Sequence, residues 1–287
     1  MHWQKVESTS EIALTESLIL EGNALSVLQQ IPDGSVQCCV TSPPYWGLRD
    51  YDVLGQIGLE ASVEQYIKSL VDVFREVNRA LTPNGVLWLN IGDSYTSGGR
   101  TSRAPDKKNP ARSMSVRPDT PPGLKPKDLI GVPWRLAFAL QSDGWYLRSD
   151  IIWEKPNCMP ESVKDRPTRS HEYIFLMSKS EKYYYDHQAT RESNRNKRSV
   201  WSVNTKPFMA AHFATFPTQL IEPCILAGSR ESDVVLDPFF GSGTVGVVCK
   251  SLNRQFVGIE LNPDYVKIAV NRINDIDKTT SPEKELL

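Results

Sequence analysis

Residues 41–47 of the chain are Thr-Ser-Pro-Pro-Tyr-Trp-Gly, and they follow the apolar run Val36–Val40. The run predicts a buried strand. The two prolines end it in a stiff, extended turn because proline lacks an N–H and has a fixed φ. This turn places the Ser42 hydroxyl, the Pro43 carbonyl and the Tyr45 ring at a strand end, where open α/β sheets bind ligands. Taken alone, the same turn also suits a strand that simply stops and a tyrosine that packs.

A second pattern lies near the C-terminus, where a strand, a glycine-rich loop, a helix and another strand follow one another. They are expected at Val234–Asp237, Pro238–Gly243, Thr244–Leu252 and Phe256–Glu260. Glycines allow a tight turn close to a ligand, and the carboxylate of Glu260 can accept hydrogen bonds from ribose hydroxyls. Asp237 would repel a pyrophosphate but suits a cationic amino-acid group. The pattern therefore favours S-adenosylmethionine over NAD or ATP.

The composition is that of an ordinary globular protein, with 287 residues, 40% of them hydrophobic, and a net charge of −1. No apolar run is long enough to span a bilayer, and the acidic N-terminal residues do not resemble a signal peptide. The five cysteines form no C-x-x-C pair, which argues against a zinc site or a disulfide framework. The four histidines do not cluster, so we assign no metal ligand. We expect a reducing, cytoplasmic setting.

The small net charge hides two basic segments. Residues 100–127 contain eight Lys and Arg against two Asp, and residues 191–206 contain five Lys and Arg against one Glu. An otherwise acidic scaffold with basic segments is typical of an enzyme that binds a polyanion, although any charge run can also be a solvated loop. The candidates for contact with such a polyanion are Arg100, Arg103, Lys107, Lys108, Arg195, Lys197 and Arg198.

The remaining pattern predicts alternating strands and helices. Strands are expected at 18–20, 86–91, 146–153 and 171–177, and helices at 25–31, 63–81, 133–140, 218–226 and 265–273. Ser62 and Gln65 belong to a capping box that opens the helix at 63–81, and Pro83-Asn84-Gly85 is expected to end that helix. Residues 1–17 show no clear pattern.

Asp237–Thr244 (DPFFGSGT) and Ser42–Tyr45 (SPPY) resemble the cofactor and catalytic motifs of amino-group DNA methyltransferases. The resemblance extends to Phe256–Tyr265, Phe216-Pro217 and His171–Ser178, and covers most of the chain except the two basic segments. Because the catalytic motif comes first, the order resembles the circularly permuted β group. The resemblance implies an α/β, Rossmann-like S-adenosylmethionine-dependent methyltransferase fold with a mostly parallel seven-stranded sheet. The implied cofactor-binding residues are Asp237, Pro238, Phe239, Gly241, Gly243, Thr244, Glu260 and Asn262.

We expect the chain to form a single catalytic domain, 1–287. Its parts are a catalytic half (18–96 and 128–178), a basic loop (97–127), a target-recognition insert (179–214) and a cofactor-binding half (215–275). The insert is assigned to recognition because it combines positive charge with aromatic residues. The basic loop is expected to close over DNA after it binds.

The residues of the first turn suggest a mechanism. An exocyclic amine on a base is a poor nucleophile because its lone pair is delocalised into the ring. The Ser42 hydroxyl and the Pro43 carbonyl can hold its hydrogens and direct the lone pair at a sulfonium methyl, and Pro44 keeps the turn stiff. Tyr45 would stack on the base, which must leave the duplex to reach the site. Asp93, at another predicted strand end, is a further catalytic candidate, with strand capping as its alternative role.

Ser42 rather than Asp at the first motif position resembles the N4-cytosine enzymes. The expected activity is therefore methyl transfer to the N4 amine of a flipped cytosine in duplex DNA, without a metal. An N6-adenine methyltransferase is the first alternative. A methyltransferase acting on RNA or protein and a non-catalytic DNA-binding protein follow it. A restriction endonuclease that acts separately and a second copy of the chain are open as partners, and no membrane association is expected.

Overall fold

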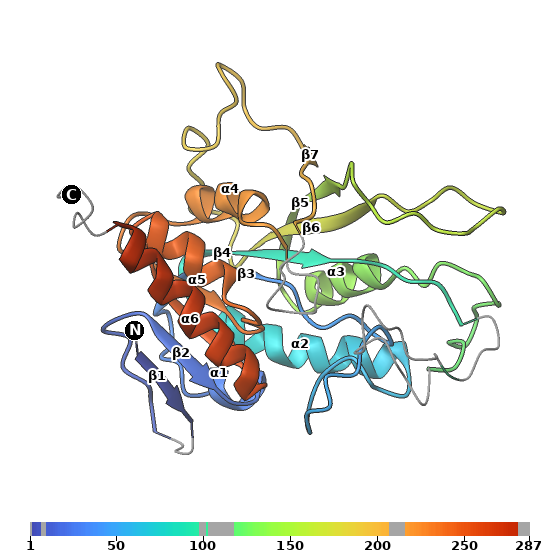
Figure 1. Cartoon of the computed structure of the whole chain (residues 1–287), viewed down its shortest axis with the longest axis horizontal. Helices are drawn as coiled ribbons and strands as arrows, with labels where there is room; N and C mark the ends of the chain where they lie inside the picture. Colours follow the sequence, from blue (N-terminus) through green and yellow to red (C-terminus); the bar gives the residue numbers. More distant parts are fainter. Residues whose placement is uncertain (1, 7–9, 98–101, 103–117, 207–215, 281–287) are drawn as a thin grey trace, which may run out of the picture.

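The computed structural model describes residues 2–6, 10–97, 102, 118–206 and 216–280, which form one sheet with helices on both faces (Figure 1). The strands are β1 (His2–Lys5), β2 (Leu18–Glu21), β3 (Val36–Thr41), β4 (Leu81–Ile91), β5 (Tyr146–Glu154), β6 (His171–Ser178), β7 (Val200–Ser202), β8 (Val234–Asp237) and β9 (Gln255–Glu260). The helices are α1 (Ala24–Leu28), α2 (Val63–Ala80), α3 (Val132–Ser142), α4 (Thr218–Gly228), α5 (Thr244–Ser251) and α6 (Pro263–Thr280). Within these ranges no helix is both long and apolar enough to cross a membrane.

The strand order is β1-β2-β9-β8-β3-β4-β6-β5-β7, and only the pairs that include β6 are antiparallel. The mostly parallel sheet is therefore confirmed, but in the described ranges it has nine strands rather than the predicted seven. The two additional strands are the outermost ones. All four residues of β1 are exposed, and only Trp201 is buried among the three residues of β7. Strands this short and exposed leave no alternation that the sequence could reveal.

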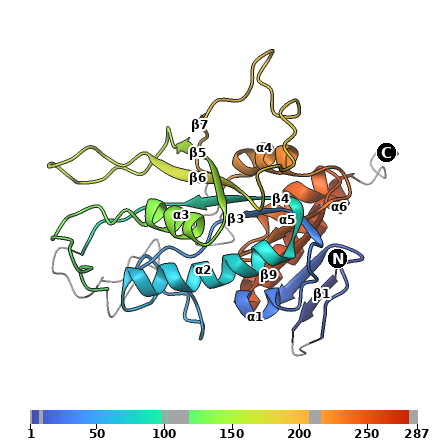
Figure 2. The ribbon, with the colours of Figure 1, turned by 180° about the vertical axis from the view of Figure 1, so that it is seen from behind.

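Two hydrophobic cores lie on opposite faces of the sheet. One packs the sheet against α1, α2 and α3, and the other packs it against α4, α5 and α6. Seen from behind, α2 and α3 still lie together and apart from α4, α5 and α6 (Figure 2). Cys38 and Cys39 are neighbours in β3 and point into different cores, as the alternation of side chains along a strand requires. This is the doubly wound arrangement of α/β proteins.

Helix α2 begins as its sequence predicts but ends earlier. The Ser62 side chain accepts a hydrogen bond from the Gln65 N–H, which is the expected capping contact. The helix ends at Ala80, and Leu81 is already extended and paired with β3. Pro83-Asn84-Gly85 consequently lies within the first residues of β4 instead of ending the helix. The Leu81 side chain is fully buried, and this burial favours the strand over a further helical turn.

The topology brings several strand ends to one edge of the sheet. The carboxyl ends of β3, β4, β8 and β9 lie at this edge because these strands are parallel. Strand β6 runs the other way, so its second residue, Glu172, lies at the same edge, as does Lys155 just after β5. In Figure 1 the connection between β5 and β6 extends beyond the edge. The candidate site lies along this line of strand ends.

Candidate active site

The predicted catalytic turn, Ser42–Tyr45, leaves β3 at this edge and is held from two sides. The carbonyl oxygen of Pro44 accepts a hydrogen bond of 2.8 Å from the Tyr66 hydroxyl on α2. Gly58 lies against the turn with a φ of +109°, and a Cβ there would come within 3.2 Å of the Tyr45 carbonyl oxygen. The backbone of the turn is therefore fixed, as two consecutive prolines predict, while Ser42 remains half-buried at its start.

The Tyr45 ring is half-buried, and its hydroxyl is engaged inside the protein. It donates a hydrogen bond of 2.7 Å to Glu172 Oε2. Burial raises the pKa of Tyr45 well above its usual value, the Glu172 carboxylate raises it further, and a hydrogen bond with the Ser42 side chain opposes the rise. Ser42, Tyr45 and Glu172 thus lie together, although Glu172 carries no sequence signal beyond its place in the resembling segment His171–Ser178.

The predicted cofactor loop, Pro238–Gly243, lies between β8 and α5. Gly243 has a φ of +79°, and a Cβ there would come within 2.8 Å of a side chain of α6, so this close packing requires glycine. The Gly241 N–H donates to Glu260 Oε2 at 2.7 Å, and the Asn262 N–H donates to Glu260 Oε1 at 2.8 Å. Burial raises the pKa of Glu260 to about 7 although these hydrogen bonds oppose the rise. The Leu261 N–H is a third backbone donor to this carboxylate, so of its roughly four acceptor sites about one remains for a ligand hydroxyl.

Asp237, the last residue of β8, is only 1% exposed. Its Oδ1 accepts hydrogen bonds from the Thr41 hydroxyl at 2.6 Å and from the Phe239 N–H at 3.0 Å. Burial raises the pKa of Asp237 to about 7, against the effect of both hydrogen bonds. Thr41 immediately precedes Ser42, so a buried hydrogen bond joins the catalytic turn directly to the cofactor loop.

The other predicted cofactor residues divide into buried and accessible ones. Pro238 and Thr244 are buried, and Thr244 Oγ1 accepts a hydrogen bond of 3.2 Å from Arg272 Nη1. Phe239 and Asn262 are half-buried. The buried pair shapes the loop from within, whereas Phe239 and Asn262 are partly accessible, and the contact of all four with the cofactor stays a prediction. Two carboxyls whose pKa values are raised by burial suit a ligand that brings positive charge and hydroxyl donors, and this donor set fits a sulfonium amino acid joined to a nucleoside.

The loop Gly47–Gly58, in which the sequence shows only polar and aromatic residues, contacts the catalytic turn at Gly58 and helix α6 at Tyr51. Its Tyr51 packs edge-on against Tyr265 of α6, with ring centroids 6.3 Å apart. Burial raises the pKa of both tyrosines, and the Glu260 carboxylate adds to the rise. Tyr51 and Tyr265 therefore lie near Glu260 at the end of β9. No motif or spacing in the sequence indicates that they meet.

Asp93 caps helix α3. Its Oδ1 accepts hydrogen bonds from the N–H groups of Ser94 at 2.9 Å, Gly131 at 3.0 Å and Val132 at 3.0 Å. Its Oδ2 lies 3.9 Å from Arg169 Nη1, and its side chain is 3% exposed. Burial raises the pKa of Asp93, and the backbone hydrogen bonds oppose the rise. These contacts are those of a cap, and a direct part for Asp93 in the reaction stays a prediction.

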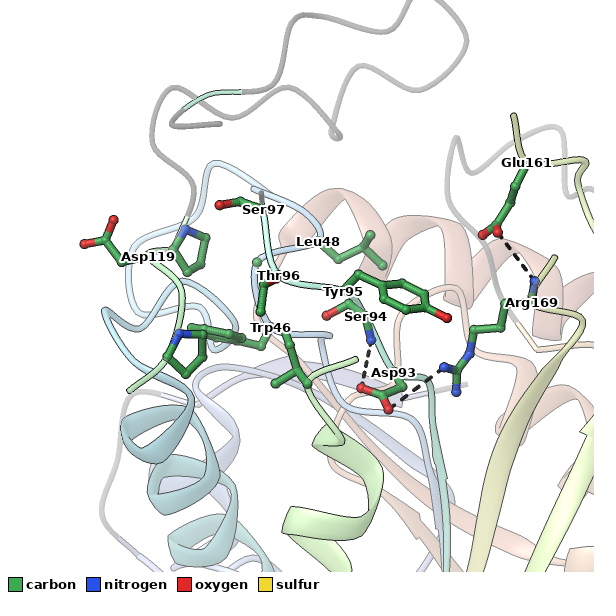
Figure 3. A pocket seen from close by; sticks show the side chains of 14 residues that line it. Trp46, Leu48, Asp93, Ser94, Tyr95, Thr96, Ser97, Asp119, Glu161 and Arg169 are labelled. Carbon is green, nitrogen blue, oxygen red and sulfur yellow. Dashed lines mark hydrogen bonds and ion pairs between the residues drawn. The ribbon is translucent and has the colours of Figure 1, made fainter. Parts of the chain in front are cut away.

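Asp93 and Arg169 also line a cavity of about 300 Å³ beside the catalytic turn (Figure 3). Figure 3 shows the two side chains facing each other, and the rings of Tyr95 and Trp46 form part of the cavity wall. Trp46 directly follows Tyr45, so the cavity adjoins the turn. The lining combines aromatic rings with charged and hydroxyl groups, which suits a planar polar ligand.

The predicted DNA-contact residues fall into two groups. Arg100, Arg103, Lys107 and Lys108 lie outside the described residues. Arg195 and Arg198 are exposed on the segment before β7. The neighbouring Lys197 is 18% exposed, with its Nζ 2.6 Å from Glu192 Oε1 and 5.0 Å from the centroid of the Trp201 ring. Lys197 therefore supports the local fold, and its contact with DNA stays a prediction.

Solved structures show the class to which this fold belongs. The PvuII DNA methyltransferase, titled cytosine-N4-specific, superposes with a TM-score of 0.71 at 22% identity, covering 94% of this chain and 90% of that one. A protein from Thermus thermophilus described as a "Putative DNA Modification Methylase", solved in complex with S-adenosyl-L-methionine, gives a TM-score of 0.63 at 28% identity, covering 90% of this chain and 94% of that one. The fold is the Rossmann-like methyltransferase fold that the motifs imply, so that prediction is confirmed.

Sequence comparison gives the family. Residues 36–271 match the family described as DNA methylase (N6_N4_Mtase). The Type II methyltransferase M.Cfr9I from Citrobacter freundii is 66% identical over 279 residues, which cover 96% of this chain and 93% of that protein. The chain therefore belongs to the DNA methylase family, as a Type II DNA methyltransferase of the restriction–modification kind.

Proposed function

We propose that the protein transfers a methyl group from S-adenosylmethionine to the exocyclic N4 amine of a cytosine that has left the DNA duplex. The observation that carries the proposal is the buried hydrogen bond of 2.6 Å from Thr41 to Asp237, which holds the catalytic turn beside the cofactor loop. An amine held at Ser42 and a methyl donor held at the loop would meet at one edge of the sheet. Such an arrangement favours direct transfer by proximity. The amine nitrogen would form the new N–C bond as the bond between the methyl group and the sulfur breaks, the neutral thioether would leave, and the amine would release one proton to solvent.

The catalytic turn would prepare the amine for attack. The Ser42 hydroxyl and the Pro43 carbonyl are acceptors for its two N–H bonds, and holding them draws the nitrogen lone pair out of conjugation with the ring. Tyr66 and Gly58 fix the backbone that carries these acceptors. Because the acceptors are fixed before substrate binds, little reorganisation is needed during the reaction. Tyr45 would stack on the base and complete its orientation.

The cofactor loop and the end of β9 would hold S-adenosylmethionine, which supplies an electrophilic methyl group on its sulfonium. Glu260 is placed to accept hydrogen bonds from ribose hydroxyls, with Phe239 and Asn262 beside it. Asp237, whose Oδ1 already serves Thr41 and Phe239, would favour the cationic amino-acid group through its charge. The Thermus structure, which was solved in complex with S-adenosyl-L-methionine, supports the assignment.

Cytosine is proposed because Ser42 occupies the first position of the catalytic motif, which resembles the N4-cytosine enzymes. Adenine N6 is the alternative, since its amine could use the same two acceptors. The cavity beside Trp46 supports the entry of a flipped base, because its wall combines aromatic rings with polar groups.

Duplex DNA would bind through the basic segments. We assign target recognition to 179–214, where Arg195 and Arg198 are exposed, and closure over DNA to 97–127. Residues 18–96 and 128–178 would form the catalytic half, and 215–275 the cofactor half. Phosphate contacts make affinity fall steeply with salt, so DNA binding that is flat between 50 and 200 mM salt, about a fourfold range, would contradict this surface. We also propose a cytoplasmic setting and, as a partner, a restriction endonuclease that acts separately. The other proposed partner is a second copy of the chain, and light scattering would detect such a homodimer.

The test is to incubate the purified protein with S-adenosylmethionine and unmodified genomic DNA, digest the DNA to nucleosides and identify the product by mass spectrometry. N4-methylcytosine is the expected product. N6-methyladenine would overturn the choice of base and leave the mechanism in place. No methylated base, with the cofactor still bound, would overturn the assignment to DNA.

A further inference from the structure

We propose that Glu172, held by Lys155, is a positioning residue that fixes the Tyr45 ring as the surface on which the flipped base stacks. The inference rests on the proposed function and deepens it, because neither residue belongs to the catalytic turn or to the cofactor loop. Glu172 is the second residue of β6, and Lys155 follows the last residue of β5.

The Glu172 carboxylate is engaged on both oxygens. Oε2 accepts hydrogen bonds from the Tyr45 hydroxyl at 2.7 Å and from Asn90 Nδ2 at 3.3 Å, and Oε1 is bound by Lys155 Nζ. The side chains of Glu172 and Lys155 are only 17% and 18% exposed. Charge-assisted hydrogen bonds away from water are strong and directional, so the Tyr45 hydroxyl has one favoured position.

The edge of the Tyr45 ring is confined as well. A Cβ on Gly92 would lie 2.7 Å from Tyr45 Cε2 and 3.2 Å from Glu172 Cδ, so the ring edge and the carboxylate both pack directly on the backbone just after the end of β4. With its hydroxyl bound and its edge packed, the ring has little freedom to rotate. A ring that is fixed in advance loses less entropy when a base stacks on it. The hydrogen-bond network of Tyr45, Glu172, Lys155 and Asn90 would provide this preorganisation.

Lys155 makes the buried carboxylate tolerable, because an unpaired charge in this position would be strongly destabilising. Its Nζ also lies 4.2 Å from the centroid of the Trp153 ring, which places the ammonium group from a second side. Asn90 is restrained in turn, since its Nδ2 donates to the Tyr173 carbonyl at 3.1 Å. The three strands β4, β5 and β6 therefore cooperate to position one hydroxyl.

A merely structural network would show a different response to substitution. Its loss would lower the melting temperature and leave the chemical step unchanged. A positioning network would slow methyl transfer at saturating DNA while cofactor binding stays the same. Tyr45→Phe separates the two cases because it keeps the ring and removes only the hydroxyl.

The test measures kcat, KM for DNA, cofactor Kd and melting temperature for Tyr45→Phe, Glu172→Gln, Lys155→Met and the double variant of Tyr45 and Glu172. Each single substitution should lower kcat about 10- to 100-fold with unchanged cofactor Kd, as expected for losing a hydrogen bond to a charged group. The double variant should be no slower than the slower single variant, because both changes break the same contact.

A matched control is Glu76→Gln, which breaks a 2.7 Å ion pair with Arg79 on α2 and should keep the wild-type kcat. Wild-type kcat in Tyr45→Phe would overturn the inference, and so would fully additive effects in the double variant. If Glu172→Gln does not fold, Tyr45→Phe alone decides. A wild-type protein that methylates no base would overturn the proposed function itself, so the two failures are distinguishable.

Discussion

The catalytic turn and the cofactor loop follow neighbouring parallel strands, β3 and β8, yet they are held in different ways. The cofactor loop is fixed by partners close to it in the C-terminal part of the chain, since Gly241 donates to Glu260, 19 residues away, and Gly243 packs against Ala269 of α6. The catalytic turn relies on more distant partners. Tyr66 lies 22 residues from Pro44, and the carboxylate that binds the Tyr45 hydroxyl lies 127 residues away.

This difference suggests that cofactor binding belongs to a local unit, whereas catalytic geometry belongs to the whole sheet. Substitutions in the partners of the turn should spare cofactor binding. Substitutions in the loop should weaken cofactor binding first. The hydrogen bond from Thr41 to Asp237 is the point where the two regions touch.

Replacing Ser42 should give the largest effect and the clearest separation of the two regions. Ser42→Ala removes one of the two acceptors for the amine and leaves the cofactor loop intact. We expect kcat to fall about 100- to 1,000-fold, by analogy with losing one preorganised polar contact to a transition state, with an unchanged cofactor Kd.

Single-turnover kinetics and calorimetry would measure the two quantities. Ser35→Ala is the matched control, because its Oγ donates at 2.7 Å to the Pro32 carbonyl just before β3, at the other end of the strand. Wild-type methyl transfer in Ser42→Ala would remove Ser42 from the reaction and with it the proposed contrast.

The packing of the cofactor loop can be tested at Gly241 and Gly243, its two glycines with a positive φ. Gly243→Ala combines a φ of +79° with a Cβ only 2.8 Å from the Ala269 Cβ, whereas Gly241→Ala, at a φ of +52°, meets no atom closer than 4.0 Å. We expect Gly243→Ala to lower the free energy of unfolding by about 2–3 kcal/mol, and Gly241→Ala by about 1 kcal/mol. Urea unfolding gives both values, and equal losses would contradict the packing argument.

The same contrast explains how much of the molecule its sequence could reveal. The fold of the segment β8–α5–β9, which carries the cofactor loop, was predictable because its strands, glycines and Glu260 occur in chain order within a short span. The Ser62 cap was predictable for the same reason. The extended conformation of Leu81 was not predictable, because its burial against β3 overrides the turn signal of Pro83-Asn84-Gly85 that follows.

The partners of the catalytic turn could not be predicted either. The contact between Tyr45 and Glu172 exists because antiparallel β6 lies between β4 and β5, and no spacing in the sequence contains that fact. The capping contact of Asp93 likewise joins β4 to residues 131 and 132. A strand end marked the edge of the site, but only the fold showed which side chains meet there.

The buried carboxyls of the cofactor unit should make it sensitive to pH. Burial raises the pKa of Asp237 and Glu260 to about 7 in the folded protein, well above the ordinary carboxyl range. Between about pH 4 and 7 the folded protein therefore holds protons that the unfolded chain has released, so in the absence of cofactor its free energy of unfolding should fall as pH rises through this window.

Cofactor binding should depend on pH in the opposite direction. An ammonium group and ribose hydroxyls favour ionised carboxylates, so binding should release protons and weaken as pH falls below about 7. We expect the cofactor Kd to be about tenfold higher at pH 6 than at pH 8, which one pKa unit of coupling permits. Calorimetry in buffers of different ionisation enthalpy would detect the protons that are released when the cofactor binds. Glu260→Gln should reduce their number, and equal Kd values without proton release would contradict the coupling.

Substituting Asp93 should give the smallest effect, and the result decides whether Asp93 belongs to the catalytic site or only caps α3. As a cap it needs only an acceptor oxygen, so Asp93→Asn should keep most of the stability, whereas Asp93→Ala should lose about 1 kcal/mol or somewhat more. If capping is its whole role, Asp93→Asn also keeps kcat, because the turn and its partners are untouched. A normal melting temperature with a tenfold lower kcat in Asp93→Asn would instead require the negative charge near the reacting amine. The catalytic site would then extend from β3 to the end of β4, and the sheet edge rather than the turn would be its functional unit.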